Sequence, residues 1–92
     1  MSFYDIYTLA TAQKNSMYNM EKIKKVEHVG CYFCKKMYKS IEIEKTTDNG
    51  KTAVCPYCNI DAVIPESKDY YLKQSLLNAM NSYFLQPPKE DD

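Results

Sequence analysis

The sequence contains no arginine, and its twelve lysines are balanced by twelve acidic residues. A chain without net charge has no strong general attraction for the nucleic-acid backbone. The absence of arginine also removes the side chain that most often reads guanine through two hydrogen bonds. The positive charge that exists is local, because residues 22 to 45 hold seven lysines against three glutamates. We therefore expect at most a modest basic face.

Long apolar runs are also missing. Asp5 and Lys14 interrupt the first twenty residues, so no signal peptide or membrane-spanning segment is expected there. The sequence therefore favours a cytoplasmic protein, in a compartment where stable disulfides are rare. Cysteines in such a protein more often bind metals or carry out redox chemistry.

Glycine is scarce, with two residues in 92, and 45% of the chain is hydrophobic. These values and the absence of repeats indicate one globular domain, which we expect over residues 1–88. Residues 89–92 follow two prolines and read as a disordered acidic tail. A core of this size leaves little free energy over conformational entropy, so a metal, a disulfide or a partner is expected to assist it.

The four cysteines form two Cys-x-x-Cys pairs, and twenty residues separate the pairs. Two such turns can place four sulfurs around one tetrahedral zinc ion, whose ligands are expected to be Cys31, Cys34, Cys55 and Cys58. The single histidine, His28, is not needed for this set and reads as an ordinary strand or surface residue. Four protein ligands leave no open position for substrate, which indicates structural zinc in a protein that is not an enzyme.

Helical periodicity appears at the start of the chain. Apolar residues at spacings of three and four predict a first helix over residues 3–14, where Ser2 and Asp5 resemble a capping box. A weaker stripe predicts a second helix that ends near Lys25.

A hairpin is expected between the cysteine pairs. Residues 41–44 alternate isoleucine with glutamate, Asp48-Asn49-Gly50 is a tight-turn signal, and residues 51–54 can form the returning strand. Residues 60–64 predict a third short strand that Pro65 ends. The glutamates read as the solvent-facing side of the hairpin.

An apolar stripe predicts a C-terminal amphipathic helix over residues 70–85, with Ser67 or Asp69 as its cap. The expected fold class is therefore small α+β. It consists of a zinc ribbon, made of a hairpin and a third strand, with one or two helices before it and one after it.

Thiol redox chemistry is an alternative use of the second pair, because Cys55-Pro56-Tyr57-Cys58 looks like the active-site motif of glutaredoxins. A redox thiol normally lies where such a motif opens a helix, whose amides stabilise the thiolate. Here a predicted strand follows the motif, and no alternation of strands and helices surrounds it. The context therefore favours metal binding.

Two segments carry a family resemblance: Gly30-Cys31-Tyr32-Phe33-Cys34, and residues 51–64, which end in Ile60-Asp61-Ala62-Val63-Ile64. They resemble a group of small, mostly uncharacterised bacterial and phage cytoplasmic proteins with paired cysteine knuckles. The resemblance covers about residues 29–64 and implies zinc and a cytoplasmic location, but no settled activity. The chain departs from the family pattern at Asn59, where glycine is usual, and in lacking the usual tryptophan.

Aromatic residues are abundant, and several lie in or beside the cysteine pairs among lysines. The leading hypothesis is a zinc-stabilised module that binds a protein, such as a host protein if the chain derives from a phage, through its helices or aromatic surface. The alternative is a nucleic-acid-binding ribbon, in which aromatics stack on bases and lysines pair with phosphates.

The terminal helices could also join two copies of the chain. Asp61 has no catalytic partner in the sequence. The candidate interaction residues are Tyr32, Phe33, Lys35, Lys36, Lys39, Tyr57, Leu72, Leu76, Met80 and Tyr83.

Overall fold

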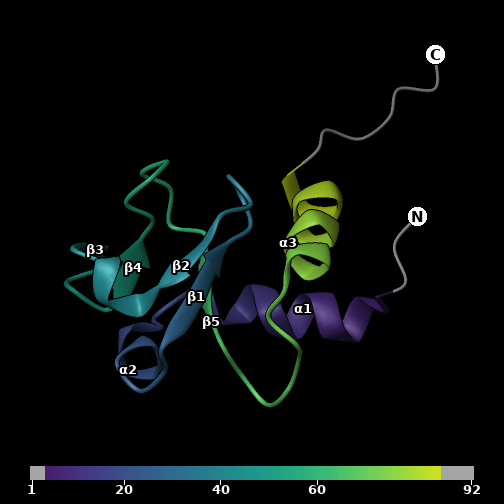
Figure 1. Cartoon of the computed structure of the whole chain (residues 1–92), viewed down its shortest axis with the longest axis horizontal. Helices are drawn as coiled ribbons and strands as arrows, with labels where there is room; N and C mark the ends of the chain where they lie inside the picture. Colours follow the sequence, from purple (N-terminus) through teal and green to yellow (C-terminus); the bar gives the residue numbers. More distant parts are fainter. Residues whose placement is uncertain (1–3, 86–92) are drawn as a thin grey trace.

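The structure is a computed structural model that describes residues 4–85. Helices α1 (Ile6–Lys14) and α3 (Gln74–Met80) lie on one side of the molecule, and two small antiparallel sheets lie on the other. Figure 1 shows α3 standing across α1, with the sheets beside the pair. The α+β class expected from the sequence is confirmed.

Helix α1 begins after Asp5, whose side chain accepts a hydrogen bond from the Thr8 amide at 2.7 Å. The first predicted helix is thus confirmed with a later start, and Ser2 lies outside the described residues. The second predicted helix is reduced to one turn, α2 (Met20–Ile23). Tyr18 explains the difference, because its left-handed backbone (φ 49°) breaks the helix before it can continue.

The larger sheet has three strands: β1 (His28–Cys31), β2 (Met37–Lys39) and β5 (Val63–Pro65), in the order β2-β1-β5. Both neighbours run antiparallel to β1. The predicted third strand therefore starts later than expected and includes Pro65, which is tolerated because β5 lies at the edge of the sheet. It pairs with β1 rather than with the predicted hairpin.

The smaller sheet is a hairpin of β3 (Lys45–Thr47) and β4 (Thr52–Val54). The predicted turn is confirmed, because Asp48, Asn49 and Gly50 all take left-handed backbone angles. The predicted strand at residues 41–44 is wrong.

Residues Ser40–Glu42 instead form a 3-10 turn, η1, in which the Glu42 carboxylate accepts from the Lys39 amide. No strand lies beside the alternating isoleucines and glutamates, and Ile41 is 84% exposed. An alternating pattern needs a partner strand, and none is paired with it among the described residues, although Ile43 packs against the core.

The C-terminal helix begins later than predicted. Residues 70–73 are not helical, since Tyr70 is buried and its hydroxyl donates to the carbonyl of Pro65 at 2.6 Å. Neither Ser67 nor Asp69 caps α3, and a π-helical turn, η2 (Asn81–Leu85), follows it. In the described chain, no helix has the length and apolar character needed to cross a membrane.

The core lies between the two helices and the three-stranded sheet. Leu76, Leu77 and Met80 of α3 are fully buried there. A Cβ atom on Gly30 of β1 would lie 2.9 Å from Leu77 Cδ1, so α3 needs glycine at this position in order to pack so closely. Leu76 and Met80, predicted as interaction residues, are core residues instead, because α3 turns its apolar stripe inward.

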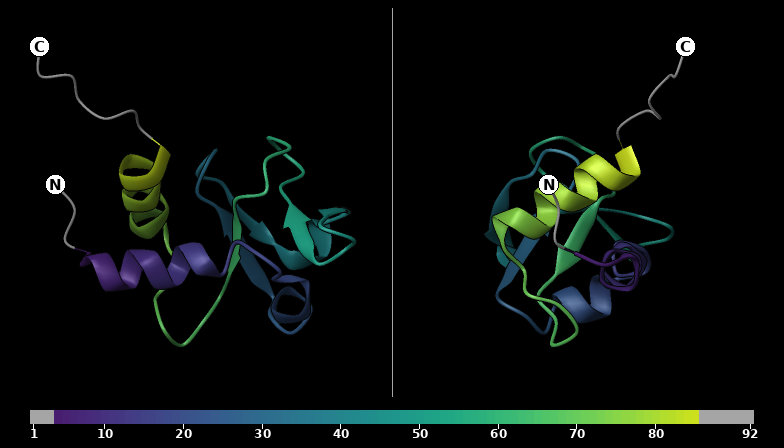
Figure 2. Two further views of the ribbon diagram at one scale, coloured as in Figure 1. Left: turned by 180° about the vertical axis from the view of Figure 1, so that it is seen from behind. Right: turned by 90° about the vertical axis from the view of Figure 1, so that its right-hand side faces the viewer.

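One buried side chain joins the N-terminal helices to both sheets. Asn19 is completely buried, and its Nδ2 donates to the carbonyls of Asn15 and Val63, each at 2.7 Å. Its Oδ1 accepts from the Ala53 amide at 3.0 Å. The contact to Val63 lies in β5 and the contact to Ala53 lies in β4, so Asn19 fixes the two sheets relative to each other. Figure 2 shows the sheets from two further sides.

Candidate metal centre

The four cysteines meet at one point. Their sulfur atoms all lie within 4.8 Å of one another, although the two pairs are far apart in sequence. The sulfurs of Cys31 and Cys58 are 3.6 Å apart, and those of Cys34 and Cys55 are 3.8 Å apart. A metal with bonds of about 2.3 Å to sulfur requires a tetrahedral edge of about 3.8 Å. The sulfurs are too far apart for disulfides, and all four thiols are free.

The first pair lies in a tight loop, knuckle 1 (residues 31–36), at the tip of the β1–β2 hairpin. The Cys31 amide donates to the Lys36 carbonyl at 2.9 Å and closes the loop. The Lys35 amide donates to the Cys31 carbonyl at 2.8 Å, and Lys35 takes a left-handed backbone angle of 66°. This geometry places the second cysteine of the pair, Cys34, beside the first.

The second pair lies in knuckle 2 (residues 55–60), which repeats this geometry with a different sequence. The Cys55 amide donates to the Ile60 carbonyl at 3.0 Å, and the Asn59 amide donates to the Cys55 carbonyl at 2.9 Å. Asn59 takes a left-handed angle of 64°, as its counterpart does in knuckle 1. Asn59 can hold this turn because asparagine tolerates the left-handed conformation.

The fold brings the two knuckles together from different sheets. Knuckle 1 connects β1 and β2, whereas knuckle 2 follows β4 and precedes β5. The amide of Tyr32 donates to the carbonyl of Ala62 at 3.0 Å, which joins knuckle 1 to the segment between knuckle 2 and β5. An ion held by all four sulfurs would thus link the smaller sheet to the larger one.

Helix α3 and the turn η2 hold knuckle 1 from outside. The side-chain amide of Asn81 donates to the carbonyls of Tyr32 and Phe33, both at 3.0 Å. The side-chain amide of Gln74 donates to the carbonyl of Lys35 at 2.8 Å. Three carbonyls of a strongly bent loop are thereby satisfied, which keeps the loop in one conformation.

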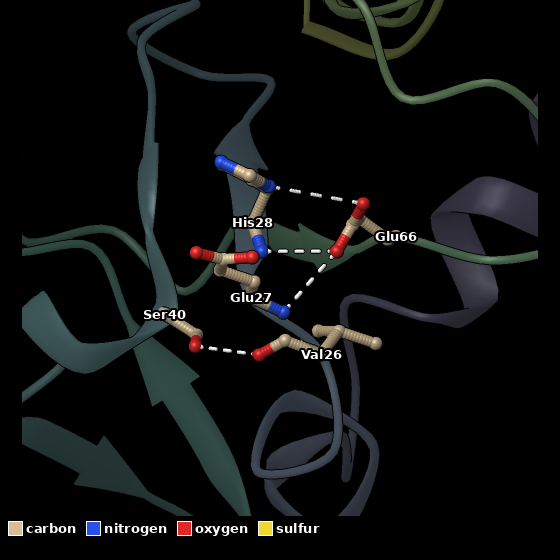
Figure 3. A network of polar contacts seen from close by, with 5 residues as sticks. All are labelled: Val26, Glu27, His28, Ser40 and Glu66. Atoms are coloured by element: carbon tan, nitrogen blue, oxygen red, sulfur yellow. Dashed lines mark hydrogen bonds and ion pairs between the residues drawn. The ribbon is translucent and has the colours of Figure 1, made fainter.

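The far end of β1 is anchored by the network in Figure 3. Glu66, directly after β5, accepts hydrogen bonds from the amides of Glu27 and His28 at 3.2 and 3.0 Å. Its other oxygen lies 3.8 Å from Nδ1 of His28. Ser40 donates to the carbonyl of Val26 at 2.7 Å on the other side of the strand. His28 is therefore a strand residue at the surface and lies outside the sulfur cluster.

The surroundings of the sulfurs affect their ionisation unequally. Burial raises the pKa of Cys31, and it raises the pKa of Cys58 to about 11. Burial also opposes ionisation of Cys55, but the Tyr38 hydroxyl and the amides of Tyr57 and Cys58 donate toward its sulfur and lower the pKa overall. Without a metal, Cys31 and Cys58 therefore keep their protons at neutral pH. A divalent cation would displace these protons from the thiols.

Tyr38 is the side chain of β2 that points into the protein. It is 7% exposed, and its hydroxyl makes no fully formed hydrogen bond within the described part of the chain. The hydroxyl faces the sulfur of Cys55 instead, while the ring meets the ring of Tyr57 edge-on at 5.1 Å. Burial, followed by the cysteine sulfurs, raises the pKa of Tyr38, so its hydroxyl stays protonated.

The predicted interaction residues divide into buried and exposed groups. Tyr32 is 6% exposed and its ring lies against Phe84 in the core, so it does not form part of an exposed surface. Leu72 is half-buried against the core. The exposed members are Phe33, Lys35, Lys36, Lys39, Tyr57 and Tyr83.

Tyr57 is half exposed, but its ring already has partners. The ammonium group of Lys36 lies 4.7 Å from the ring centroid, and the edge contact with Tyr38 occupies another direction. Its hydroxyl donates to the carboxylate of Glu42. These contacts hold the ring in place and leave less of it available for stacking on a base.

Sequence reasoning identified the four sulfurs, but it did not identify the groups that support them. Nothing in the pattern around Asn19, Gln74 or Asn81 distinguishes them from surface residues. Tyr38 could be noticed only as an aromatic residue near a knuckle. Comparisons with protein families, with curated proteins and with solved structures found no match for the chain. The site is therefore interpreted from its own geometry.

Proposed function

We propose that the four cysteines bind one structural zinc ion and that the chain is a zinc-ribbon-type interaction module without enzymatic activity. The observation that carries this proposal is the pair of equivalent knuckles, which bring four free sulfurs within 4.8 Å of one another. Four thiolates in a tetrahedral arrangement suit zinc, and four protein ligands leave no open coordination position for a substrate.

Elemental analysis of freshly purified protein tests the metal directly. One zinc per chain supports the proposal. One iron per chain would keep the site and change its metal, since tetrahedral sulfur sites also suit iron. Changing Cys31 to serine should remove the metal, whereas changing the exposed Ser75 to alanine should leave it bound. Purified wild-type protein that contains no metal and cannot be loaded with any would contradict the proposal.

The redox alternative has less support from the geometry. A reactive Cys-x-x-Cys motif normally opens a helix, but residues 59–62, which follow the motif, are not helical. Close sulfur contacts also run between the knuckles, at 3.6 Å for Cys31–Cys58 and 3.8 Å for Cys34–Cys55. A thiol–disulfide exchange assay on metal-free protein distinguishes the two functions.

The interaction role is supported by an apolar concavity between α1 and the C-terminal helical segment. It has a volume of about 260 Å³. Its lining residues are Tyr4, Ile6, Leu9, Ala79, Ser82 and Tyr83. Ile6 and Tyr83 are about half exposed, which is typical of a surface that an apolar side chain of another protein can cover.

Affinity capture from the source cells tests this role with paired variants. Ile6→Asp and Tyr83→Asp place charge in the concavity and should lose a partner that wild type retains. Ile41→Asp is the matched control, because Ile41 is an equally apolar, highly exposed residue on η1. The partner must then bind again in purified form. Recovery that is equal for all variants would remove the concavity from consideration, and sedimentation analysis shows whether the partner is a second copy of the chain.

Nucleic-acid binding is the second candidate, because Phe33 and three lysines are exposed on and just after knuckle 1. Fluorescence anisotropy with single-stranded and double-stranded oligonucleotides tests it. Binding should weaken steeply as salt rises, and changing Lys35 and Lys39 to glutamine should reduce the salt dependence. An absence of binding at low salt excludes this candidate.

A further inference from the structure

Tyr38 occupies a special place between the two knuckles. It lies on β2, the strand that leaves knuckle 1, where it pairs with Val29. Its strand neighbours Met37 and Lys39 are exposed, so Tyr38 is the residue of this strand that faces the interior. Its ring nevertheless packs edge-on against Tyr57 of knuckle 2 at 5.1 Å, and its buried hydroxyl interacts with the sulfur of Cys55 without completing a hydrogen bond to it. The side chain thus reaches from one knuckle to a ligand in the other.

The hydroxyl is a buried donor without a completed hydrogen bond. Among the described residues, no other buried side-chain nitrogen or oxygen lacks a partner. Burial of an unpaired hydroxyl destabilises a protein, and phenylalanine would fill the same space without that penalty. The hydroxyl therefore needs an acceptor within its reach. A metal-bound cysteine sulfur can serve as that acceptor, because an ionised sulfur accepts a hydrogen bond more strongly than a neutral thiol does.

We propose that the Tyr38 hydroxyl donates a hydrogen bond to the Cys55 thiolate when the centre holds its metal, and thereby sets how tightly the metal is held. This assignment rests on the proposed metal centre. Four thiolates around a divalent cation carry a net charge of minus two, which donors around the sulfurs must stabilise. The Tyr57 amide, 3.4 Å from the Cys55 sulfur, is one such donor. Tyr38 adds a side-chain donor to the same sulfur.

Tyr38→Phe isolates the hydroxyl, because the ring and its edge contact with Tyr57 remain. Tyr7→Phe is the control, since it removes the hydroxyl of an exposed tyrosine in α1, outside both knuckles. Both variants and wild type are titrated with Co²⁺, whose sulfur charge-transfer bands report the thiolates, and then with Zn²⁺ against a competing chelator.

Tyr38→Phe should bind one metal ion with an affinity lower by about 10- to 100-fold, the usual effect of losing an outer hydrogen bond to a metal ligand. Its cobalt charge-transfer band should move to lower energy, because the sulfur lone pairs lose a stabilising donor. Tyr7→Phe should keep the wild-type affinity and spectrum. In metal-free protein, Tyr38→Phe should retain at least as much structure as wild type. A merely structural role would predict the opposite result.

A second measurement needs no variant. In wild-type protein loaded with NMR-active cadmium, the Tyr38 hydroxyl proton should exchange slowly with solvent and show scalar coupling to the metal. Wild-type affinity and an unchanged spectrum in Tyr38→Phe, or a freely exchanging hydroxyl proton, would overturn the assignment and leave the metal centre intact. Failure of wild type to bind cobalt, zinc or cadmium would overturn both.

Discussion

Lys35 shows how the centre constrains single residues. It lies at the same position in knuckle 1 as Asn59 in knuckle 2, and both take left-handed backbone angles. Asparagine tolerates this region, whereas a lysine in it costs roughly 1 kcal/mol or more of conformational free energy. The loop keeps this conformation because the Gln74 side chain donates a hydrogen bond to the Lys35 carbonyl and the Lys35 amide donates one to the Cys31 carbonyl. Knuckle 1 therefore contains strain that knuckle 2 avoids.

Replacing Lys35 with asparagine should relieve this strain. We expect the metal-loaded protein to become more stable by up to about 1 kcal/mol, as measured by urea unfolding with zinc present. Lys68→Asn, which makes the same exchange where the backbone angle is not positive, should bring no gain. If Lys35→Asn is no more stable relative to wild type than Lys68→Asn is, the left-handed turn is not strained.

The contribution of Tyr70 to the stability of the fold depends on pH. Burial raises the pKa of Tyr70 to about 12, compared with about 10 for an exposed tyrosine. Because the folded state favours the protonated hydroxyl, the stabilisation is fully present below pH about 10 and is lost as the pH rises through about 12. The hydroxyl donates to the Pro65 carbonyl and accepts from Asn15.

Tyr70→Phe should therefore be less stable than wild type at pH 8 by about 1–3 kcal/mol. The difference should shrink as the pH rises from about 10 to about 12, because wild type then loses the contribution that the variant lacks. Denaturant unfolding at a series of pH values measures this difference. Tyr7→Phe removes an exposed hydroxyl and serves as the control. A gap that stays constant across this range would contradict the prediction.

At the scale of elements, the structure depends on two close associations. Helix α3 packs on β1 at Gly30, where the Leu72 and Leu77 side chains occupy the space that a Cβ would need. Asn19 makes three buried hydrogen bonds, and two of them join β4 to β5. The first association holds the helix that supports knuckle 1. The second positions the strands on both sides of knuckle 2.

Gly30→Ala should push α3 away from the sheet and destabilise the protein by about 1–3 kcal/mol, the usual cost of overpacking. Thermal unfolding of metal-loaded protein measures the loss. A compensating variant tests the cause, because Gly30→Ala combined with Leu77→Val should recover part of the stability by freeing space at the contact. Equal stability of Gly30→Ala and wild type would show that Leu77 moves aside without cost.

Asn19→Ala leaves two carbonyls and one amide without partners in the interior, at a cost of about 3 kcal/mol or more. It should also weaken zinc binding, although Asn19 is not a ligand, because the strands around knuckle 2 lose their link. Unfolding and zinc competition measure the two effects together. Asn78→Ala removes an exposed amide with a single 3.3 Å contact to Gln74 and should change neither. An unaltered zinc affinity in Asn19→Ala would show that the hydrogen bonds of Asn19 do not affect the metal centre.

At the scale of the whole molecule, the proposed metal joins two sheets that the polypeptide connects only loosely. Among the described residues, the sheets share no ladder of backbone hydrogen bonds, and Asn19 ties them together near the site through its bonds to Val63 and Ala53. The core is small, so metal binding can supply a large share of the folding free energy. Chelation should therefore remove cooperative unfolding, which circular dichroism during heating can follow.

Protons and the metal should compete for the same sulfurs. Burial raises the pKa of Cys31 and raises that of Cys58 to about 11, so at least these two thiols lose protons when a metal binds near neutral pH. Zinc affinity should thus fall by about 100-fold for each unit of pH decrease in this range. Competition with a zinc indicator between pH 6 and 8 measures the slope. An affinity independent of pH would show that zinc binding releases no protons from these thiols.

Local physics explains what could be predicted from the amino-acid order. The spacing of the four cysteines predicted the cluster of sulfurs that the structure shows, because a Cys-x-x-Cys turn has few ways to aim two sulfurs. Asp48-Asn49-Gly50 identified the turn for a similar reason, since few residues accept successive left-handed angles. The first helix was found because its apolar spacing and its cap agree over nine residues. Each of these signals is complete within a short segment.

The remaining features depended on contacts between distant segments. Strands of three or four residues are too short for a periodic signal, so neither β2 nor the pairing of β1 with β5 could be read in advance. The isoleucines at 41 and 43 showed a strand pattern with no partner to pair with. The inward turn of α3, the hub at Asn19 and the approach of Tyr38 to Cys55 arose only when the sheets and helices packed together. The sequence alone thus determined which atoms can hold a metal, and the tertiary structure decided what surrounds them.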